Sequence, residues 1–199
     1  MEFPELNVRL PEWLPKLFQG PERVYPSIEE RMGLVIELAR LNVEKEKAGP
    51  FAAAVFEMRT GKLVAPGVNL VLQLNCAILH AEMVAIAMAQ KILGTYDLGG
   101  PAMPAHEIVI NTEPCAMCLG AIPWSGVRRL VCGARDEDAR IIGFDEGNKP
   151  FDWALSLKNR GIYVVQDMLR EEAMTVLEEY QSAGGIIYNS RRGSPPAGT

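Results

Sequence analysis

Apolar residues recur at helical spacing in three long segments of the chain. The first predicts a helix over residues 27–47, because Ser27 begins a capping-box pattern and apolar positions follow every three or four residues. The second predicts a helix from His80 to Leu93, which a glycine closes. The third predicts a last helix that begins at Asp167. Its apolar face consists of Leu169, Ala173, Val176, Leu177 and Tyr180.

Shorter apolar runs, bounded by turn residues, predict five β-strands. Residues 51–56 and 63–65 flank a turn-like tetrapeptide and predict an antiparallel pair, which Pro66 and Gly67 are expected to end. The other strands are predicted at residues 108–110, 130–132 and 162–165.

Two further helical segments lie between the later strands. One is predicted from Cys115 to about Trp124, and the other lies near residues 151–159, in a connection long enough for a parallel crossover. Strands that alternate with helices are typical of an α/β protein. The pattern therefore predicts a three-layer α/β/α sandwich.

The length of 199 residues suits one domain with a sizeable core. We expect a proline-rich, irregular arm over residues 1–26, the domain itself over 27–185, and a C-terminal tail over 186–199. No apolar run reaches about 18 residues, and the first residues lack a signal-peptide pattern. We therefore expect a cytoplasmic protein without a membrane partner.

Charge and cysteine content narrow the classes of function. The chain has 25 acidic and 20 basic residues and a formal charge of -5, whereas domains that bind nucleic acids usually carry a basic surface. Its four cysteines, without a secretory signal, are more typical of metal ligands or core thiols than of disulfides. We expect a small-molecule partner and no nucleic acid.

Two short motifs carry the chemistry. They are His80-Ala81-Glu82 and Pro114-Cys115-Ala116-Met117-Cys118. Cys115 and Cys118 are three residues apart at the start of a predicted helix, so both sulfurs lie on one face of one turn and can bind the same ion. His80 and Glu82 would point to nearly opposite sides of a regular helix, so we expect this pair at a helix terminus. Helix N-termini favour the thiolate form of cysteine.

A ligand set of His80, Cys115 and Cys118 predicts one catalytic zinc ion per subunit, because three protein ligands leave the fourth tetrahedral position for water. Zinc lowers the pKa of such a water from about 15.7 to about 7, which corresponds to roughly 12 kcal/mol. Glu82 is the candidate proton shuttle between this water and the substrate. Positioned proton transfer of this kind contributes about 10² to 10⁴ in rate.

The alternative is a closed structural zinc site in which Cys132, Cys76 or His106 supplies a fourth ligand. Such a site would explain neither Glu82 nor Pro114. Taken alone, Cys132 and Cys76 are expected to be small apolar residues of a strand and a loop. His106, beside an acidic residue and before a strand, is expected to be a solvated edge residue.

The two motifs resemble the cytidine deaminase-like superfamily, and within it the guanine deaminases. The resemblance extends from about Pro50 to Gly133. It is carried by Pro50-Phe51, Asn69, His80-Ala81-Glu82, Glu113 to Cys118, and Gly120-Ala121-Ile122. It implies a five-stranded mixed sheet flanked by helices, a homodimer at least, and the hydrolysis of guanine to xanthine and ammonia by zinc-bound hydroxide.

The resemblance also implies contacts with the substrate. Glu146 matches an acidic position that meets the adjacent N1-H and 2-amino donors of guanine, and Asp145 is its rival. Asn69 can offer a donor and an acceptor to the other ring edge. Phe51 and Trp124 are candidates to sandwich the base, although both residue types are equally typical of a core.

Ala81 and Tyr188 complete the candidate substrate contacts. Guanine deaminases of this type close their site with the C-terminal segment, in some cases from the partner subunit. The apolar run of Ile186, Ile187 and Tyr188 after a Gly-Gly pair is therefore interpreted as a lid. The alternative is that Ile186 and Ile187 add an edge contact to the sheet of their own subunit.

Three other functions remain open. The same motifs permit deamination of adenine in transfer RNA, but that reaction needs a basic surface. Deamination of cytidine or deoxycytidylate needs a sugar- or phosphate-binding cluster. A zinc-stabilised binding module without catalysis belongs to a different class, and it would lose its fold on metal removal rather than its activity first. Amino-triazines and pterins remain open as further substrates.

Overall fold

The computed structural model describes residues 3–190 of the chain. A mixed sheet of five strands lies at its centre, in the order β2-β1-β3-β4-β5. The strands are β1 (Ala52–Glu57), β2 (Leu63–Val68), β3 (His106–Thr112), β4 (Arg129–Ala134) and β5 (Tyr163–Val165). β1 pairs antiparallel with β2 and with β3, whereas β3, β4 and β5 are parallel to one another.

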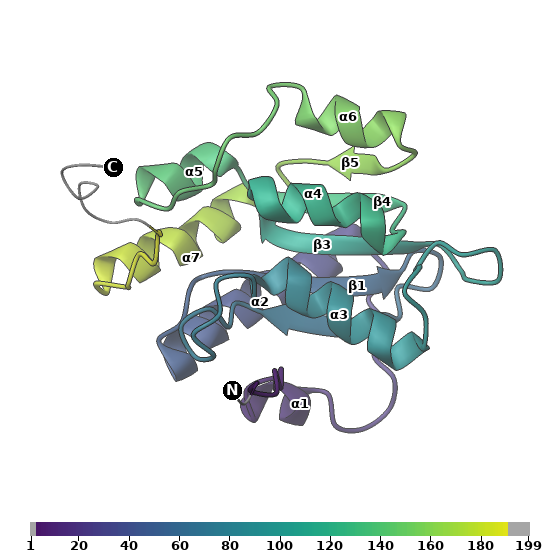
Figure 1. Ribbon diagram of the computed structural model, residues 1–199, viewed down its shortest axis with the longest axis horizontal. Helices are drawn as coiled ribbons and strands as arrows, with labels where there is room; N and C mark the ends of the chain where they lie inside the picture. The colour runs from purple at the N-terminus through teal and green to yellow at the C-terminus, as the bar shows by residue number, and fades with distance from the viewer. Residues whose placement is uncertain (1–2, 191–199) are drawn as a thin grey trace.

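Helices cover both faces of this sheet (Figure 1). They are α1 (Trp13–Leu17), α2 (Ile28–Glu46), α3 (Ala81–Leu93), α4 (Ala116–Ser125), α5 (Asp136–Ile141), α6 (Trp153–Asn159) and α7 (Arg170–Ser182). α2, α5 and α7 pack on one face, and α3, α4 and α6 pack on the other. The predicted three-layer α/β/α sandwich with a mixed five-stranded sheet is confirmed.

The central strands are buried on both faces because each face meets a layer of helices. In β1, Ala52, Ala54 and Phe56 belong to the core beneath α2 and α7, whereas Ala53 and Val55 belong to the core beneath α3. This alternation follows from the two-residue period of a strand. It is the reason that β1 has a continuous apolar sequence.

Helix α2 begins as its capping pattern predicts. The hydroxyl of Ser27 accepts a hydrogen bond from the Glu30 N–H at 3.1 Å, and the Glu30 carboxylate accepts one from the Ser27 N–H at 3.0 Å. This reciprocal pair satisfies two of the free N–H groups at the helix start. At the other end, Lys47 adopts a left-handed conformation with φ 51° and ends the helix.

Strand β2 does not end at Pro66, as the sequence led us to expect, but continues to Val68. β2 is an edge strand, where a proline without an N–H is tolerated. Gly67 allows a close approach between this strand and α3, because a Cβ at Gly67 would lie 2.4 Å from the carbonyl oxygen of Ala81. The first turn of α3 is therefore pressed directly onto the sheet.

The last helix starts at Arg170, so the prediction that it begins at Asp167 was wrong. Asp167 has φ 60°, and its carboxylate accepts hydrogen bonds of 2.8 and 2.9 Å from the guanidinium of Arg135. A tertiary ion pair thus replaces the expected N-cap. The buried face of the helix is otherwise as predicted, with Ala173, Val176, Leu177 and Tyr180.

His106 is not the solvated edge residue that the sequence suggested. β3 begins at His106, and the side chain is buried, with Nδ1 2.8 Å from the Leu98 carbonyl oxygen.

The N-terminal arm also differs from expectation, because it contains the short helix α1, whose Leu14 is fully buried. Among residues 3–190, no helix is both long and apolar enough to cross a membrane.

A buried ion pair links α2 to the sheet. The Glu107 carboxylate on β3 accepts hydrogen bonds from Arg31 of α2 and Arg129 of β4, and the side chains of Glu107 and Arg31 are almost fully buried. Arg31 also donates to the carbonyl oxygen of Tyr25 at 2.7 Å. These bonds attach the last residues of the arm to the start of α2 and to the sheet.

Replacing Glu107 with Gln is expected to lower the free energy of unfolding by about 3 to 5 kcal/mol, because Arg31 would remain buried without its counter-charge. Urea denaturation measures the change. Glu179→Gln is the matched control, since Glu179 pairs with Arg40 at the surface and its side chain is 54% exposed. That variant should change the stability by less than about 0.5 kcal/mol. Equal changes in the two variants would contradict a special contribution from the buried pair.

Candidate metal centre and adjoining cavity

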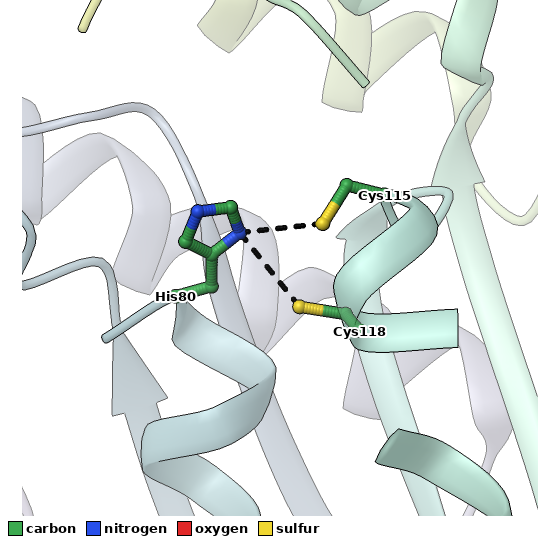
Figure 2. A group of neighbouring side chains, drawn as sticks. All are labelled: His80, Cys115 and Cys118. Atoms are coloured by element: carbon green, nitrogen blue, oxygen red, sulfur yellow. Dashed lines mark hydrogen bonds between the residues drawn. The ribbon is translucent and has the colours of Figure 1, made fainter. Parts of the chain in front are cut away.

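Two helix N-termini bring three soft donor side chains together. His80 is the N-cap of α3, and Cys115 is the N-cap of α4, with Cys118 one turn further along α4. Figure 2 shows the imidazole of His80 facing both sulfurs. Both motifs therefore begin helices, as their spacing predicts.

The three donors fit a tetrahedral zinc ion. His80 Nδ1 lies 3.4 Å from Cys115 Sγ and 3.7 Å from Cys118 Sγ, and the three ligand atoms lie within 4.8 Å of one another. Bond lengths of about 2.0 to 2.1 Å to nitrogen and about 2.3 Å to sulfur, at tetrahedral angles, separate the two ligand atoms by roughly 3.6 Å. The observed separations match this value, so the side chains suit one zinc ion.

The protonation of the two thiols points to the same conclusion. A hydrogen bond from Cys118 lowers the pKa of Cys115 to about 4, against the effect of burial and with help from His80. The hydrogen bond to Cys115, together with burial, raises the pKa of Cys118. Two buried sulfurs so close together cannot both be ionised without a positive charge between them. A dication would supply that charge and make both sulfurs ligands.

The candidate fourth ligands lie elsewhere. Cys132 is buried on β4, and Cys76 lies in the loop before α3. His106 is hydrogen-bonded to the carbonyl oxygen of Leu98, in the loop that precedes β3. Within residues 3–190, only His80, Cys115 and Cys118 form a group that could hold a metal ion. The site thus has three protein ligands, the number found in catalytic rather than closed structural zinc sites.

A cavity of about 180 Å³ adjoins the three ligands. Among the predicted site residues, it is lined by Phe51, Asn69, His80, Glu82, Cys115, Asp145, Glu146 and Tyr188. Other residues that line it are Ala52, Val71, Ala77, Ile110, Asn111, Thr112, Glu113, Phe144, Asn189 and Ser190. The cavity therefore connects the metal ligands, the end of β3, the loop before α6 and the tail.

Glu82 lies in the first turn of α3 and is 8% exposed. Burial raises the pKa of its carboxyl, and the negative charge of the Cys115 thiolate raises it further. A carboxyl group in such surroundings can exchange a proton during a reaction, because its protonated form is not strongly disfavoured. Glu82 lines the cavity without belonging to the ligand group.

Glu146 and Asp145 both line the cavity, but their surroundings differ. Asp145 is exposed, and its carboxylate accepts a hydrogen bond of 2.9 Å from the Gly147 N–H within the same turn. Glu146 is 6% exposed, and burial, followed by the charges of Cys115 and Glu82, raises its pKa to about 8. The buried carboxyl of Glu146 is thus the better candidate for contact with a ligand.

The family model for the cytidine and deoxycytidylate deaminase zinc-binding region matches residues 26–134, which contain both motifs. The chain belongs to this family. The metal of the family is zinc, and the ligand geometry agrees with that ion.

Several known proteins resemble this deaminase family member. Guanine deaminase of Bacillus subtilis (strain 168) is 36% identical over 113 residues, which cover 56% of this chain and 67% of that protein. A tRNA-specific adenosine deaminase of Rickettsia felis is 32% identical over 131 residues, which cover 66% of this chain and 85% of that protein. The solved structure of guanine deaminase from Nitrosomonas europaea is 46% identical, with a TM-score of 0.86, and covers 89% of this chain and 97% of that one. A solved complex with 2,6-diaminopurine has the same identity and TM-score and covers 94% of this chain and 97% of the other.

Two predicted substrate contacts of this family member lie outside the cavity. Trp124 is 81% exposed, because the buried face of α4 is formed by other residues, so it cannot sandwich a base in the cavity of its own chain. Ala81 is buried in the core between α3 and the sheet, where the close approach to Gly67 holds it. Its side chain does not line the cavity.

Phe51 and Asn69 line the cavity, as expected. The ring of Phe51 packs edge-on against Phe144, with 4.8 Å between centroids. The side-chain oxygen of Asn69 accepts a hydrogen bond of 3.2 Å from the Val71 N–H. This bond leaves the NH₂ group and the second lone pair of the oxygen available, so the predicted donor and acceptor roles of Asn69 stay a prediction.

The described part of the tail, residues 186–190, lies over the cavity of its own chain. Asn189 donates to the Gly143 carbonyl oxygen at 2.8 Å and accepts from the Asp145 N–H at 2.9 Å. The ring of Tyr188 packs against Phe144, with 5.1 Å between centroids. These residues form no strand, so the alternative of a sheet-edge contact was wrong for this segment. The rest of the predicted tail, 191–199, lies outside the described residues.

Asn111 is a site residue that the sequence reasoning missed. Its side chain accepts from the Ala52 N–H at 2.8 Å and donates to the Pro50 carbonyl oxygen at 2.9 Å, so it fixes the backbone on both sides of Phe51. A polar residue directly after the apolar run Ile108–Ile110 was the available signal. Lys149, described below, had no comparable signal in the sequence.

Replacing Cys115 with Ala is expected to abolish zinc binding, because only two ligands remain. Glu82→Gln should retain one zinc ion per chain and an unchanged fold, while the rate of deamination falls at least about a hundredfold. Metal analysis after gel filtration, together with an ammonia assay, measures both effects. Cys76→Ala is the control for cysteine loss and should keep metal and activity. Loss of zinc from Glu82→Gln would show that Glu82 is a ligand and not a proton shuttle.

Proposed function

We propose that this protein is a zinc-dependent hydrolytic deaminase that converts guanine and water to xanthine and ammonia. The observation that carries the proposal is the buried carboxyl of Glu146, which lines the same small cavity as the metal ligands. Guanine presents two adjacent donors, and one carboxylate can accept both. The similarity to guanine deaminases over most of the chain supports this substrate.

His80, Cys115 and Cys118 hold the zinc ion. When bound, zinc acts as a Lewis acid and lowers the pKa of a water molecule to about 7. Glu82 would transfer two protons from the attacking water in turn. The first goes to the ring nitrogen, and the second, from the oxygen that becomes the new carbonyl, goes to the departing amino group, which leaves as ammonia. The buried position of Glu82 supports this role, because a raised pKa allows the carboxyl to hold each proton before it is passed on.

The other cavity residues orient the base. Burial and the charge of Cys115 raise the pKa of Glu146, and a bound dication would offset that charge. The ionised carboxylate then receives the N1-H and 2-amino donors through its two oxygens. The Asn69 amide donates to the opposite edge of the ring, and Phe51 contacts one face. Holding a planar base at several points aligns the reacting carbon, which accounts for much of the rate gain in well-oriented reactions.

The small cavity favours a free base over a polynucleotide. The tail residues Tyr188 and Asn189 line it, and Asn189 is bonded to the loop that carries Glu146. The formal charge of -5 also argues against a phosphate-rich partner. Related proteins have been solved with 2,6-diaminopurine and with 8-azaguanine, which are free bases. Deamination of adenine in transfer RNA is the second candidate, because several relatives carry out that reaction.

We also propose a cytoplasmic homodimer that acts in purine catabolism. None of the four cysteines forms a disulfide, which suits a reducing compartment. Trp124 and Phe151 are large apolar side chains at the surface and are candidates for the contact between subunits. Exchange of the C-terminal segment between subunits remains part of this proposal.

Ammonia release from a panel of free bases, nucleosides, nucleotides and an adenosine-containing anticodon stem-loop tests the substrate. Guanine is expected to be turned over, and Glu146→Gln should lower its kcat/KM by the equivalent of about 2 to 4 kcal/mol, because an amide places a donor against a donor of the base. Asp145→Asn is the matched control, since its side-chain oxygen can still accept from Gly147. It should change kcat/KM less than about threefold.

Unchanged turnover of guanine by Glu146→Gln would remove this residue from the substrate site and promote Asp145. Turnover of the RNA stem-loop without turnover of guanine would replace the proposed function with the second candidate.

Removing residues 186–199 is expected to lower kcat/KM for guanine at least about tenfold, because the cavity loses part of its wall and admits water. Zinc content should be unchanged, and the melting temperature should stay within a few degrees. Tyr188→Ala should account for a large share of the loss, since Tyr188 packs on Phe144 at the cavity. Tyr188→Phe is the control, because the buried hydroxyl has no partner among residues 3–190. Full activity of the truncated chain would rule out the lid, and its unfolding would show the tail to be structural.

A further inference from the structure

Lys149 is a lysine with a buried side chain that lies outside the two sequence motifs, His80 to Glu82 and Pro114 to Cys118. It lies in the loop between α5 and α6, and its side chain is 6% exposed. Its ammonium group donates to the Pro114 carbonyl oxygen at 2.8 Å, lies 2.6 Å from the Asp136 carboxylate, and lies 5.5 Å from the centre of the Trp153 ring. A lysine is rarely buried in this way unless its charge is paired.

One partner of Lys149 belongs to the segment that carries the metal ligands. Pro114 directly precedes Cys115, the N-cap of α4. The adjacent Glu113 is held as well, because its carboxylate accepts from the Asp136 N–H at 3.1 Å and from Gln166 at 2.6 Å. Lys149 therefore fixes the backbone just before the first sulfur ligand.

The same loop carries Glu146, whose carboxyl is the proposed contact to the substrate. We call residues 142–152 the Glu146 loop. The Glu146 carbonyl oxygen accepts from the Ala116 N–H at 2.9 Å. Gly147 has φ 68° and packs so closely that a Cβ there would lie 2.9 Å from the Cβ of Ala116. The Glu146 loop is thus attached to the metal-binding turn at Glu146 and again at Lys149.

We propose that Lys149 is a positioning residue, whose ammonium group joins the Glu146 loop to the Pro114-Cys115 turn and thereby sets the position of the Glu146 carboxyl relative to the metal site. The identity of the substrate in this inference rests on the proposed function. A displacement of about 1 Å between a substrate contact and the reacting centre can lower the rate about a hundredfold. The effect of losing Lys149 should therefore appear mainly in kcat.

Lys149→Met is the decisive variant, because it keeps the length of the side chain and removes the charge. The protein should still fold, since Asp136 retains its ion pair with Arg140 at 2.5 Å. Lys149→Arg tests recovery by a conservative change. Lys158→Met is the matched control, because Lys158 is an exposed lysine of the nearby helix α6.

The unmodified protein and the three variants are compared for zinc content, melting temperature, and kcat and KM with guanine. The visible absorption of the cobalt(II)-substituted form of each protein is also measured, because it reports ligand geometry without substrate. Lys149→Met should retain the metal, lose at least about tenfold in kcat, and shift the cobalt bands. Lys149→Arg should recover at least half of the lost kcat, and Lys158→Met should match the unmodified protein.

A double-mutant comparison separates positioning from general destabilisation. In a Glu146→Gln background, Lys149→Met should lower kcat less than about threefold, because the residue through which it acts has already been changed. An equal loss in both backgrounds would overturn the proposal, as would full kcat with unchanged cobalt bands. Should Lys149→Met fail to fold, Asp136→Asn, which weakens the same ion pair, takes its place with the same expectations.

The cobalt spectrum keeps this inference separate from the choice of substrate. If no protein in the set acts on guanine, the proposed function fails. Shifted cobalt bands in Lys149→Met alone would then support the role of Lys149 at the metal-binding turn, and unchanged bands would overturn it.

Discussion

The site depends on the concentration of negative charge at two helix N-termini. Two sulfurs and an imidazole nitrogen lie within 4.8 Å of one another, and the buried carboxyls of Glu82 and Glu146 line the adjoining cavity. Each negative charge makes ionisation of the other acidic groups less favourable, which is why burial and the charge of Cys115 together raise the pKa of both carboxyls. The helix dipoles reduce this repulsion only in part, because each end corresponds to about half a charge. A dication supplies the missing counter-charge. Metal binding therefore changes the pKa values of the two cysteines and of the Glu82 and Glu146 carboxyls.

Close packing brings these groups to one place. Gly67 lets the first turn of α3 lie against β2, which brings His80 and Glu82 to the edge of the sheet. β3 ends directly before the turn that leads into α4, and that turn carries the sulfur ligands. The sequence elements that supply ligands are therefore the same ones that connect sheet and helices. A change in that packing would alter the metal geometry without touching a ligand.

Local patterns predicted the metal ligands and most of the elements, because helix caps, strand alternation and ligand spacing are encoded within a few residues. Features that depend on distant contacts were not predictable in this way. Asp167 had the appearance of a helix cap but pairs with Arg135, and His106 appeared solvated but is covered by the loop containing Leu98. Trp124 lies in α4, the helix in which the sequence placed it, but on the exposed face of that helix. Whether Trp124 could contact a base was not predictable until the buried face of α4 was known.

The position of Glu146 shows how a fold can place a group that no motif specifies. Its loop is irregular, so neither helix nor strand geometry holds its carboxyl in the cavity. The backbone bond to Ala116, the close contact of Gly147 and the ammonium of Lys149 supply that constraint instead. All three contacts are made to residues directly beside Cys115. The same short turn therefore holds both the Glu146 loop and the first sulfur ligand in place. An enzyme with an irregular substrate loop can in this way keep the spacing between its substrate contact and its metal constant while the rest of the loop varies in sequence.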